Sequence, residues 1–228
     1  MGILYIIATP IGNLSDITAR ALEILKEVDL VVCEDTRQTI KLLNHYQIKK
    51  PLVSYFQHSK LSKIEYIAEQ LRRGKNAALV TDAGTPGISD PGGMLVNKLT
   101  GEQANKEKIR IVPIPGPCAA VAALSVSGFP TDKFLFMGFP PHKKGREKYF
   151  KEIAAARRTI VFYESTHRIL KALEQLAALI PQRQIVVARE ITKMFETIYR
   201  GTAKQILEIL NSDKNNLKGE FVVVVNKI

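Results

Sequence analysis

The feature that most limits the folds open to this chain is the alternation of short apolar runs with amphipathic stretches along its length. The apolar runs predict strands at 3–8, 29–33, 52–55, 77–81, 109–113, 133–137, 159–163, 184–190, 196–200 and 220–226. The intervening stretches predict helices at 16–27, 36–46, 60–73, 92–103, 117–127, 145–157, 166–179 and 202–210. Because strands that alternate with helices are joined by crossovers, the first half is expected to form a parallel sheet covered by helices.

The second half of the chain changes this pattern. Only five residues separate the runs Gln184–Glu190 and Glu196–Arg200, too few for a crossover helix, so these strands are expected to pair antiparallel. The sequence therefore predicts two α/β domains. The N-terminal domain, 1–115, has a parallel sheet with flanking helices, and the C-terminal domain, 116–228, has a mixed sheet.

Two helix starts carry the residue types that cap helices. Ser15 and Asp16 are expected to cap the first helix, because a short polar side chain there can accept hydrogen bonds from free backbone amides. Ser165 or Thr166 is expected to cap a later helix in the same way.

Three of the predicted strands run into loops made almost entirely of glycine, proline and small side chains. The longest lies in the segment LVTDAGTPGISDPGG at 79–93, and the others are TPIGN at 9–13 and PGPCAA at 115–120. Bare backbone at the end of a strand lets a small ligand lie against peptide N–H and C=O groups. Together the loops indicate one pocket built from several crossovers, although each alone also fits an ordinary turn.

The charge of the chain favours a polyanionic partner. Lys and Arg number 33 against 22 Asp and Glu, a net charge of +11, and basic surfaces bind phosphates with release of counterions. One basic set follows the Pro140–Pro141 turn and includes Lys143, Lys144 and Arg146, and a second lies between 49 and 73. The alternative is a generically basic protein whose helices carry a solvated charged face.

Several common classes of site are missing from the sequence. There is no Walker A motif, no G-x-G-x-x-G after the first strand and no G-x-S-x-G elbow, which excludes the usual P-loop, Rossmann and serine hydrolase sites. The four histidines lack metal-ligand spacing, so no metal is expected. Two widely spaced cysteines favour a reducing cytoplasm, and the run at 3–8 is too short to span a membrane.

Charged side chains also follow several predicted strands. Glu34, Asp35 and Arg37 come directly after the second strand, at the edge where ligands bind in open α/β sheets. The alternative is that Asp35 caps the next helix while Glu34 pairs with Arg37. Other strands are followed in the same way by His58, by ESTHR at 164–168 and by EITK at 190–193.

Six segments, taken in this order, match the sequence pattern of a known family. They are ATPIGNL at 8–14, CEDTR at 33–37, DAGTPGISDPG at 82–92, PIPGPCAA at 113–120, VFYESTHR at 161–168 and AREITK at 188–193. With them, the chain closely resembles the ribosomal RNA small subunit methyltransferase I family, a branch of the tetrapyrrole methylase superfamily. The resemblance runs from the first strand to the last, and DAGTPGISDPG is highly specific to that branch.

The resemblance implies two α/β domains with S-adenosylmethionine in the cleft between them, in a homodimer without metal or membrane. It implies methyl transfer to the ribose 2′-hydroxyl of a cytidine in the decoding region of small-subunit ribosomal RNA, free or in the assembled subunit. Matching positions imply a cofactor set made of Pro10, Ala83, Gly84, Thr85, Ile88, Cys118, Ala119, Glu164 and Thr192.

The chain departs from the family pattern at three places. Tyr55-Phe56-Gln57-His58-Ser59 stands where the family commonly has Tyr-His-Glu-His-Asn, which weakens any catalytic role for that loop. Cys118 replaces a frequent serine, although its backbone can still serve the cofactor. Glu196 is followed by Thr197 where the family favours paired glutamates.

The implied chemistry sets tasks for the side chains. Because the sulfonium methyl group is already activated, the protein has to align the attacking oxygen and help to remove its proton. Glu34 or Asp35 is the expected general base, with Lys193 or Arg37 beside the developing alkoxide. The expected RNA contacts are Arg37, Lys143, Lys144 and Arg146. Two alternatives stay open: a methylase of a tetrapyrrole-like small molecule, and a basic RNA-binding or assembly protein with a degenerate cleft.

Overall fold

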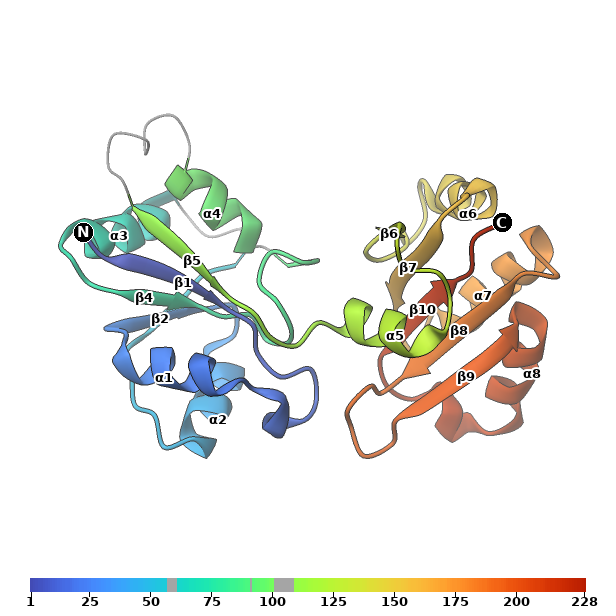
Figure 1. The fold of residues 1–228 in the computed structure, drawn as a ribbon, viewed down its shortest axis with the longest axis horizontal. Helices are drawn as coiled ribbons and strands as arrows, with labels where there is room; N and C mark the ends of the chain where they lie inside the picture. Colours follow the sequence, from blue (N-terminus) through green and yellow to red (C-terminus); the bar gives the residue numbers. More distant parts are fainter. Residues whose placement is uncertain (57–60, 91, 101–108) are drawn as a thin grey trace. The chain divides into compact units, whose positions relative to one another are not determined.

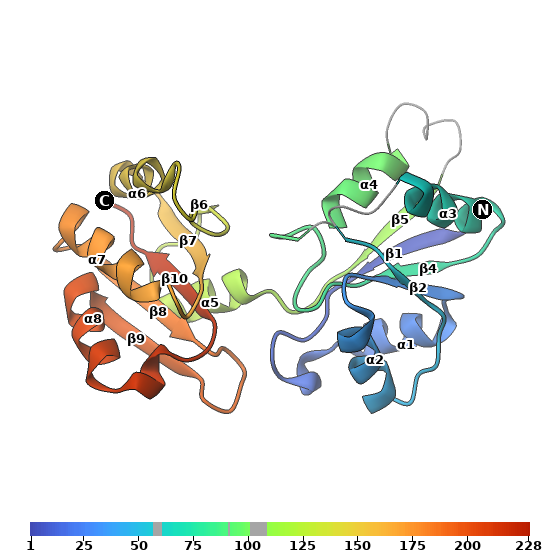
Figure 2. The same ribbon diagram turned by 180° about the vertical axis from the view of Figure 1, so that it is seen from behind.

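The computed structural model describes residues 1–56, 61–90, 92–100 and 109–228. The chain folds into two compact units, Met1–Cys118 and Ala119–Ile228 (Figures 1 and 2). His58 and the end of the helix expected at 92–103 lie outside the described residues. Among the residues described, no helix is both long and apolar enough to cross a membrane.

The first unit is built on a five-stranded parallel sheet. Its strands are β1 (Ile3–Ile7), β2 (Leu30–Cys33), β3 (Leu52–Ser54), β4 (Ala77–Leu79) and β5 (Arg110–Ile114). They lie in the order β3-β2-β4-β1-β5, and every neighbouring pair is parallel. The inner strands β2 and β4 are buried along their whole length, which is why each is a continuous apolar run in the sequence.

Helices cover both faces of this sheet (Figure 1). One face carries α1 (Ala19–Glu27) and α2 (Thr36–His45), and the other carries α3 (Leu61–Arg72) and α4 (Gly92–Thr100). Each face has its own core, because successive side chains of a strand point to opposite faces. Val31 packs with the α1 and α2 core, whereas its neighbour Val32 packs with the α3 and α4 core.

The connections leave the carboxyl edge of the sheet towards different faces. The loops after β1 and β2 lead to α1 and α2. The loop after β4, which lies between these two strands, leads to α4 on the opposite face. Ligands of open α/β sheets bind where neighbouring loops diverge in this way. The fold therefore gives the three loops of small residues a common edge, at the ends of β1, β4 and β5.

The second unit contains a mixed sheet. Its strands are β6 (Phe134–Phe136), β7 (Thr159–Glu164), β8 (Gln184–Arg189), β9 (Thr197–Thr202) and β10 (Phe221–Val225). Their order is β6-β7-β10-β8-β9; β6 and β7 are parallel, and the other neighbours are antiparallel. The expected antiparallel pairing of β8 with β9 is confirmed.

One face of this sheet carries most of the helices. They are α6 (Arg146–Ala155), α7 (Ile169–Leu179) and α8 (Ala203–Ser212), and α8 is followed by the short 3₁₀ helix η3 (Lys214–Leu217). Phe150 and Phe162 meet edge to face in the core beneath them, with ring centroids 6.1 Å apart. α5 (Ala119–Ser127) packs against β7 and β10. The expected architecture, a parallel sheet in one α/β unit and a mixed sheet in the other, is confirmed.

The caps of two helices differ from expectation. Leu14–Asp16 forms a separate 3₁₀ helix (η1), so Ser15 and Asp16 cannot cap α1. Instead the hydroxyl of Thr18 accepts a hydrogen bond from the amide of Ala21 at 3.2 Å and caps α1.

The second difference is at α7. This helix begins at Ile169, three residues after Thr166, and no side chain caps it. The hydroxyl of Thr166 donates to the carbonyl of Gly219 instead, and the carbonyl of Ser165 accepts from the amides of Arg168 and Ile169. A backbone turn therefore replaces the expected side-chain cap.

Candidate functional site

The loops after β1 and β4 are joined by backbone hydrogen bonds. The amide of Thr9 donates to the carbonyl of Gly84 at 2.9 Å, and the amide of Gly84 donates back to Thr9 at 3.0 Å. The buried hydroxyl of Thr9 donates to the carbonyl of Thr81 at 3.0 Å. Two of the three loops of small residues therefore form one structure at the carboxyl edge of the first sheet.

The loop after β5 joins the same structure. The hydroxyl of Thr85 donates to the carbonyl of Pro117 at 3.1 Å. Gly116 lies so close to the end of β1 that a Cβ atom on it would sit 3.0 Å from the Cβ of Ala8. Gly84 has a φ of +85°, which favours glycine. Small side chains are thus needed for the three loops to lie side by side.

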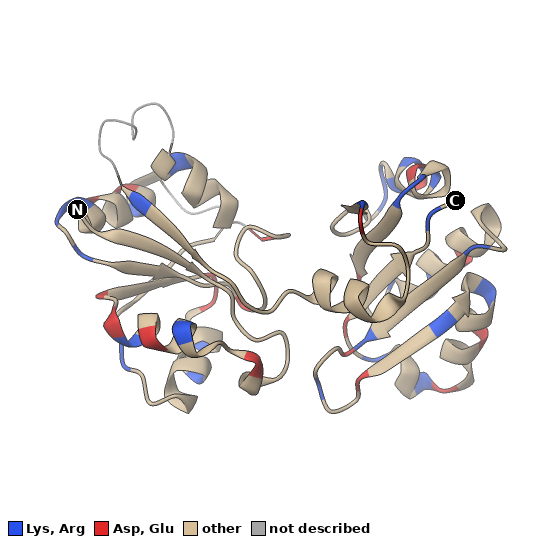
Figure 3. Cartoon of the chain, viewed as in Figure 1, with Lys and Arg blue, Asp and Glu red and all other residues tan. Residues whose placement is uncertain are grey.

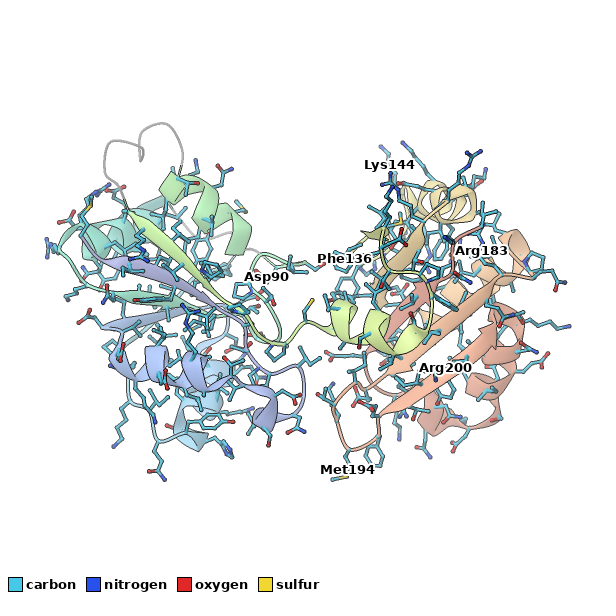
Figure 4. The ribbon with its side chains drawn as sticks, viewed as in Figure 1. Asp90, Phe136, Lys144, Arg183, Met194 and Arg200 are labelled. Atoms are coloured by element: carbon cyan, nitrogen blue, oxygen red, sulfur yellow. The ribbon has the colours of Figure 1, made fainter. Side chains whose placement is uncertain are left out.

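The candidate cofactor residues of the first unit sit on this structure. Pro10 is buried behind the edge, whereas Ala83 and Ile88 are exposed. Within the described part of the chain, the amide and carbonyl of Ala83 make no hydrogen bond, so both are available to a ligand. Asp90 shapes the same loop, because its carboxylate accepts from the amide of Gly87 at 2.8 Å and from that of Gly92 at 2.7 Å. Figure 4 shows Asp90 on this loop.

A small pocket beside this edge contains the first candidate base. Glu34, Tyr55, Thr81 and Asp90 are among its lining residues. Burial raises the pKa of Glu34, and the neighbouring carboxylates of Asp82 and Asp90 raise it further. Burial also raises the pKa of Asp82. Carboxylates in this setting hold a proton more readily than exposed ones and favour a positively charged ligand.

Asp35 has a different environment from its neighbour Glu34. Its carboxylate caps α2 by accepting from the amide of Arg37 at 2.8 Å, and it forms an ion pair with the Arg37 guanidinium at 2.7 Å. The side-chain and backbone hydrogen bonds from Arg37 lower the pKa of Asp35 to about 2. Such a carboxylate is a weak base. The structure therefore has the cap that the alternative interpretation expected, with Asp35 rather than Glu34 pairing with Arg37.

In the second unit, Arg146 is buried, unlike the neighbouring Lys143 and Lys144. Its side chain is 5% exposed, and it forms a buried ion pair with Glu164 at 3.3 Å. Its Nε also donates to Gln175 at 2.8 Å. Arg168 contacts the same Glu164 carboxylate at 2.9 Å. Because the guanidinium is buried and already paired with Glu164, little of it is left to contact RNA, and these contacts give Arg146 a place in the packing of the second unit.

The turn between β8 and β9 holds the backbone in an unusual conformation. Glu190 and Thr192 have φ values of 52° and 66°, and positive φ is rare for a β-branched residue such as threonine. The hydroxyl of Thr192 is buried, and it has no hydrogen-bond partner among the described residues. Strained residues with an unsatisfied polar atom cluster at ligand sites.

Lys193 follows in the same turn and is already paired. Its ammonium contacts Glu190 at 2.8 Å and Glu220 at 2.9 Å. Burial disfavours the charged form, but the hydrogen bonds to these carboxylates outweigh it and raise the pKa of Lys193. The Lys193 ammonium therefore stays protonated and is fixed in place by the two carboxylates. Met194, 90% exposed, extends from the tip of the turn (Figure 4).

The remaining candidates fall at the junction of the units and before α6. Cys118 is the last residue of the first unit, and Ala119 begins α5; both are half-buried. Lys143 and Lys144 are exposed on the loop before α6, where Lys144 projects outward (Figure 4). Among the described residues, no group of three or more side chains is placed to hold a metal ion.

The sequence reasoning missed Asp82, Asp90 and Tyr55 as candidates. Asp82 accepts a hydrogen bond from the amide of Asp35 at 3.2 Å, which links the loops after β2 and β4. Asp82 and Asp90 lie within the segment DAGTPGISDPG at 82–92. Their place in that segment is the signal that could have identified them as candidates. Tyr55 ends a predicted strand and begins the segment that departs from the family pattern, and the fold brings the end of β3 to the same edge.

Comparison with known proteins gives consistent matches over nearly the whole chain. The profile of the family described as "Tetrapyrrole (Corrin/Porphyrin) Methylases" matches residues 3–207. The "Ribosomal RNA small subunit methyltransferase I" of Haemophilus influenzae is 51% identical over 98% of this chain and 78% of its own length. The protein of the same name from Thermotoga maritima is 44% identical over 99% of both chains.

Solved structures show the same fold at low sequence identity. The methyltransferase CobJ has a TM-score of 0.71 at 20% identity and covers 100% of this chain and 95% of its own. A diphthine synthase has a TM-score of 0.69 at 16% identity, covering 99% and 90%. These two similarities support the arrangement of helices and strands alone.

Proposed function

Because the chain belongs to the tetrapyrrole methylase family, and within it to the ribosomal RNA small subunit methyltransferase I family, we propose that it methylates small-subunit ribosomal RNA. The methyl donor is S-adenosylmethionine, and the acceptor is the ribose 2′-hydroxyl of a cytidine in the decoding region. The observation that carries the proposal is the joined set of three glycine- and proline-rich loops at the carboxyl edge of the first sheet.

The residues at this edge fit the chemistry of the donor. The amide and carbonyl of Ala83, which make no hydrogen bond within the part of the chain that the structure describes, suit the edge of an adenine or a ribose. The small residues around Gly84 leave the backbone accessible. S-adenosylmethionine carries a sulfonium and an ammonium group, and the neighbouring carboxylates of Glu34, Asp82 and Asp90 complement positive charge. Pro10, Thr85, Ile88 and Cys118 complete the proposed contacts of this unit.

The second unit contributes its own candidates to the proposal. The buried hydroxyl of Thr192, which has no partner among the described residues, fits a ligand that supplies a hydrogen-bond donor or acceptor. Ala119 begins α5, where the Tyr163 hydroxyl already accepts from the Ala120 amide at 3.2 Å. The carboxylate of Glu164 is occupied by arginines, so only its backbone remains as a contact.

The donor supplies an activated methyl group, and the protein's task is to place the acceptor and take its proton. Positioning of this kind can lower a barrier by about 7–11 kcal/mol, and a general base contributes roughly 10²–10⁴-fold. Glu34 is the proposed base, since its raised pKa makes it a better proton acceptor than Asp35. Arg37 is exposed, and Lys193 is held by two carboxylates, so both remain cations at neutral pH.

The proposed partners follow from the same assignment. The net charge of +11 suits ribosomal RNA, with exposed Lys143, Lys144 and Arg37 as proposed phosphate contacts. A cytoplasmic location and a homodimer are further parts of the proposal.

Binding and transfer can be tested separately. Calorimetry with S-adenosylmethionine tests the cofactor, and tritium transfer from the labelled donor tests the acceptor. Undermethylated small subunits, naked small-subunit RNA and a porphyrinoid are compared side by side, and resistance of the labelled nucleotide's phosphodiester bond to alkali identifies 2′-O-methylation. Glu34→Gln is expected to bind both ligands and lose most of the turnover, with Glu23→Gln, on the exposed side of α1, as the control.

Three results would contradict parts of this proposal. Label only in the porphyrinoid would overturn the RNA assignment in favour of a small tetrapyrrole-like acceptor. Absence of donor binding would favour a basic RNA-binding or assembly protein. Full turnover in Glu34→Gln would remove Glu34 as the base.

A further inference from the structure

An open pocket lies on the second unit, between the edge strand β6 and the end of α6. Its volume is about 310 Å³. The lining residues are Leu135, Glu152, Ala155, Ala156, Arg157, Arg158 and Ile160. None of them belongs to the candidate cofactor or catalytic set. The pocket is therefore a separate feature that methyl transfer itself does not explain.

The walls of the pocket are fixed by contacts behind them. The guanidinium of Arg183 donates to the carbonyls of Ile153 at 3.0 Å and Ala154 at 2.7 Å, and so holds the last turn of α6. The hydroxyl of Thr159 donates to the carbonyl of Pro130 at 2.6 Å, which ties β7 to the segment before β6. These bonds keep the space preformed, so a ligand would not have to open it.

The rim of the pocket is basic and unpaired. Arg157 and Arg158 are exposed, and in the described part of the chain neither guanidinium makes an ion pair or a hydrogen bond. They follow α6, whose carboxyl end favours cations. Figure 3 shows further Lys and Arg positions, coloured blue, along and around this helix. The segment 131–158 holds eight basic and three acidic residues, almost half of the chain's excess positive charge.

The floor of the pocket is apolar, with one acceptor at its side. Leu135 is 40% exposed although it lies beside fully buried Ile160, so the cleft presents an uncovered apolar surface. The exposed carboxylate of Glu152 has no partner among the described residues and can accept from a base amino group. An apolar floor, a cationic rim and one acceptor match the base, phosphate and amino group of an unstacked nucleotide.

We infer that this pocket binds an unstacked nucleotide of the RNA substrate, at a position other than the methylated one. The base lies on Leu135 and Ala155, and the flanking phosphates contact Arg157 and Arg158. The volume is near the lower end of the range for small-ligand clefts, about 300–1,000 Å³, which suits one nucleotide better than a protein segment. The inference rests on the proposed function, because it takes RNA as the acceptor.

Three variants of the full chain test the inference. Arg157→Ala/Arg158→Ala removes the rim charges, and Ala155→Phe fills the pocket without changing charge. The matched control is Lys171→Ala/Lys204→Ala, which removes two exposed positive charges elsewhere on the same unit. Each variant is assayed for equilibrium binding of a small-subunit RNA fragment, for KM and kcat of methyl transfer, and for S-adenosylmethionine affinity.

The arginine and Ala155→Phe variants are expected to weaken RNA binding and raise KM by about tenfold, the low end for loss of a base contact. Their kcat and donor affinity should stay unchanged, and the control should change by less than threefold. If the pocket variants match the control, the inference fails. If they are impaired on assembled subunits alone, a ribosomal protein is the occupant and the inference also fails. If RNA binding falls as expected but wild type transfers no methyl group, the pocket stands and the proposed function falls.

Discussion

The buried carboxylate of Glu164 offers a direct test of how the second unit is held together. Its side chain is fully buried and contacts the guanidinium groups of Arg146 at 3.3 Å and Arg168 at 2.9 Å. Glu164→Gln keeps the shape of the side chain but removes its charge. The two guanidinium groups are then left without a counter-ion in a site that excludes most water.

The size of the effect follows from burial. Breaking a buried ion pair by removing one partner costs about 3–5 kcal/mol. The lower end applies here, because the Arg168 side chain is 18% exposed and keeps some hydration. For a chain of 228 residues, each kcal/mol lowers Tm by roughly 2–4 °C. A cost of about 3 kcal/mol therefore predicts a drop in Tm of roughly 6–12 °C.

Differential scanning calorimetry of the full chain measures this shift. Glu147→Gln is the matched control, because it neutralises a glutamate of the same unit whose ion pair with Lys151 is exposed to solvent. That control should leave Tm nearly unchanged. Equal shifts for Glu164→Gln and the control would refute the reasoning. So would an Arg146→Ala variant that loses RNA affinity while keeping its Tm, since Arg146 would then be an RNA contact after all.

Three further predictions concern the first unit. Thr18→Ala should lower the free energy of unfolding by about 1 kcal/mol in urea denaturation, whereas Ser15→Ala should have little effect, because Thr18 alone of the two caps α1; equal losses would restore the original cap assignment. Carboxyl NMR should show Asp35 titrating at about 2, so that its contribution to stability is present above 3.8 and is lost as pH falls towards 2; a normal midpoint would mean that the Arg37 contact is absent in solution. The methyl-transfer rate should fall on acidification through a pKa above the ordinary 4.5 of glutamate, and Glu34→Gln should abolish that dependence; an unchanged pH profile in the variant would exclude Glu34.

Much of the fold could be predicted because periodicity reports burial. The inner strands of the first unit are continuous apolar runs since both of their faces are covered by helices. The short 191–195 connection required the antiparallel pairing of β8 and β9. The caps could not be predicted in the same way. Ser15 and Thr18 are both good cap residues, and the 3₁₀ helix before α1 decided between them.

The candidate site was predictable where it depends on backbone and less so where it depends on side-chain partners. Gly84 and Gly116 were signals by their residue type: Gly84 has a positive φ, and Gly116 allows close approach to Ala8. Arg146 belonged to a basic cluster in sequence, yet the helix period turned it inward to a buried glutamate 18 residues away. The different environments of Glu34 and Asp35 likewise depend on Asp82, which the fold brings in from another loop.

Methyl transfer as proposed requires the small-residue loops of the first unit to bind the methyl donor. Hydrogen exchange of the full chain, with and without saturating S-adenosylmethionine, measures this directly at backbone amides. Slower exchange is expected across 81–88, including the amide of Ala83, which has no acceptor among the described residues. No change is expected at 73–76 on the opposite edge of the sheet. Donor binding that leaves exchange at 81–88 unaltered would contradict that requirement.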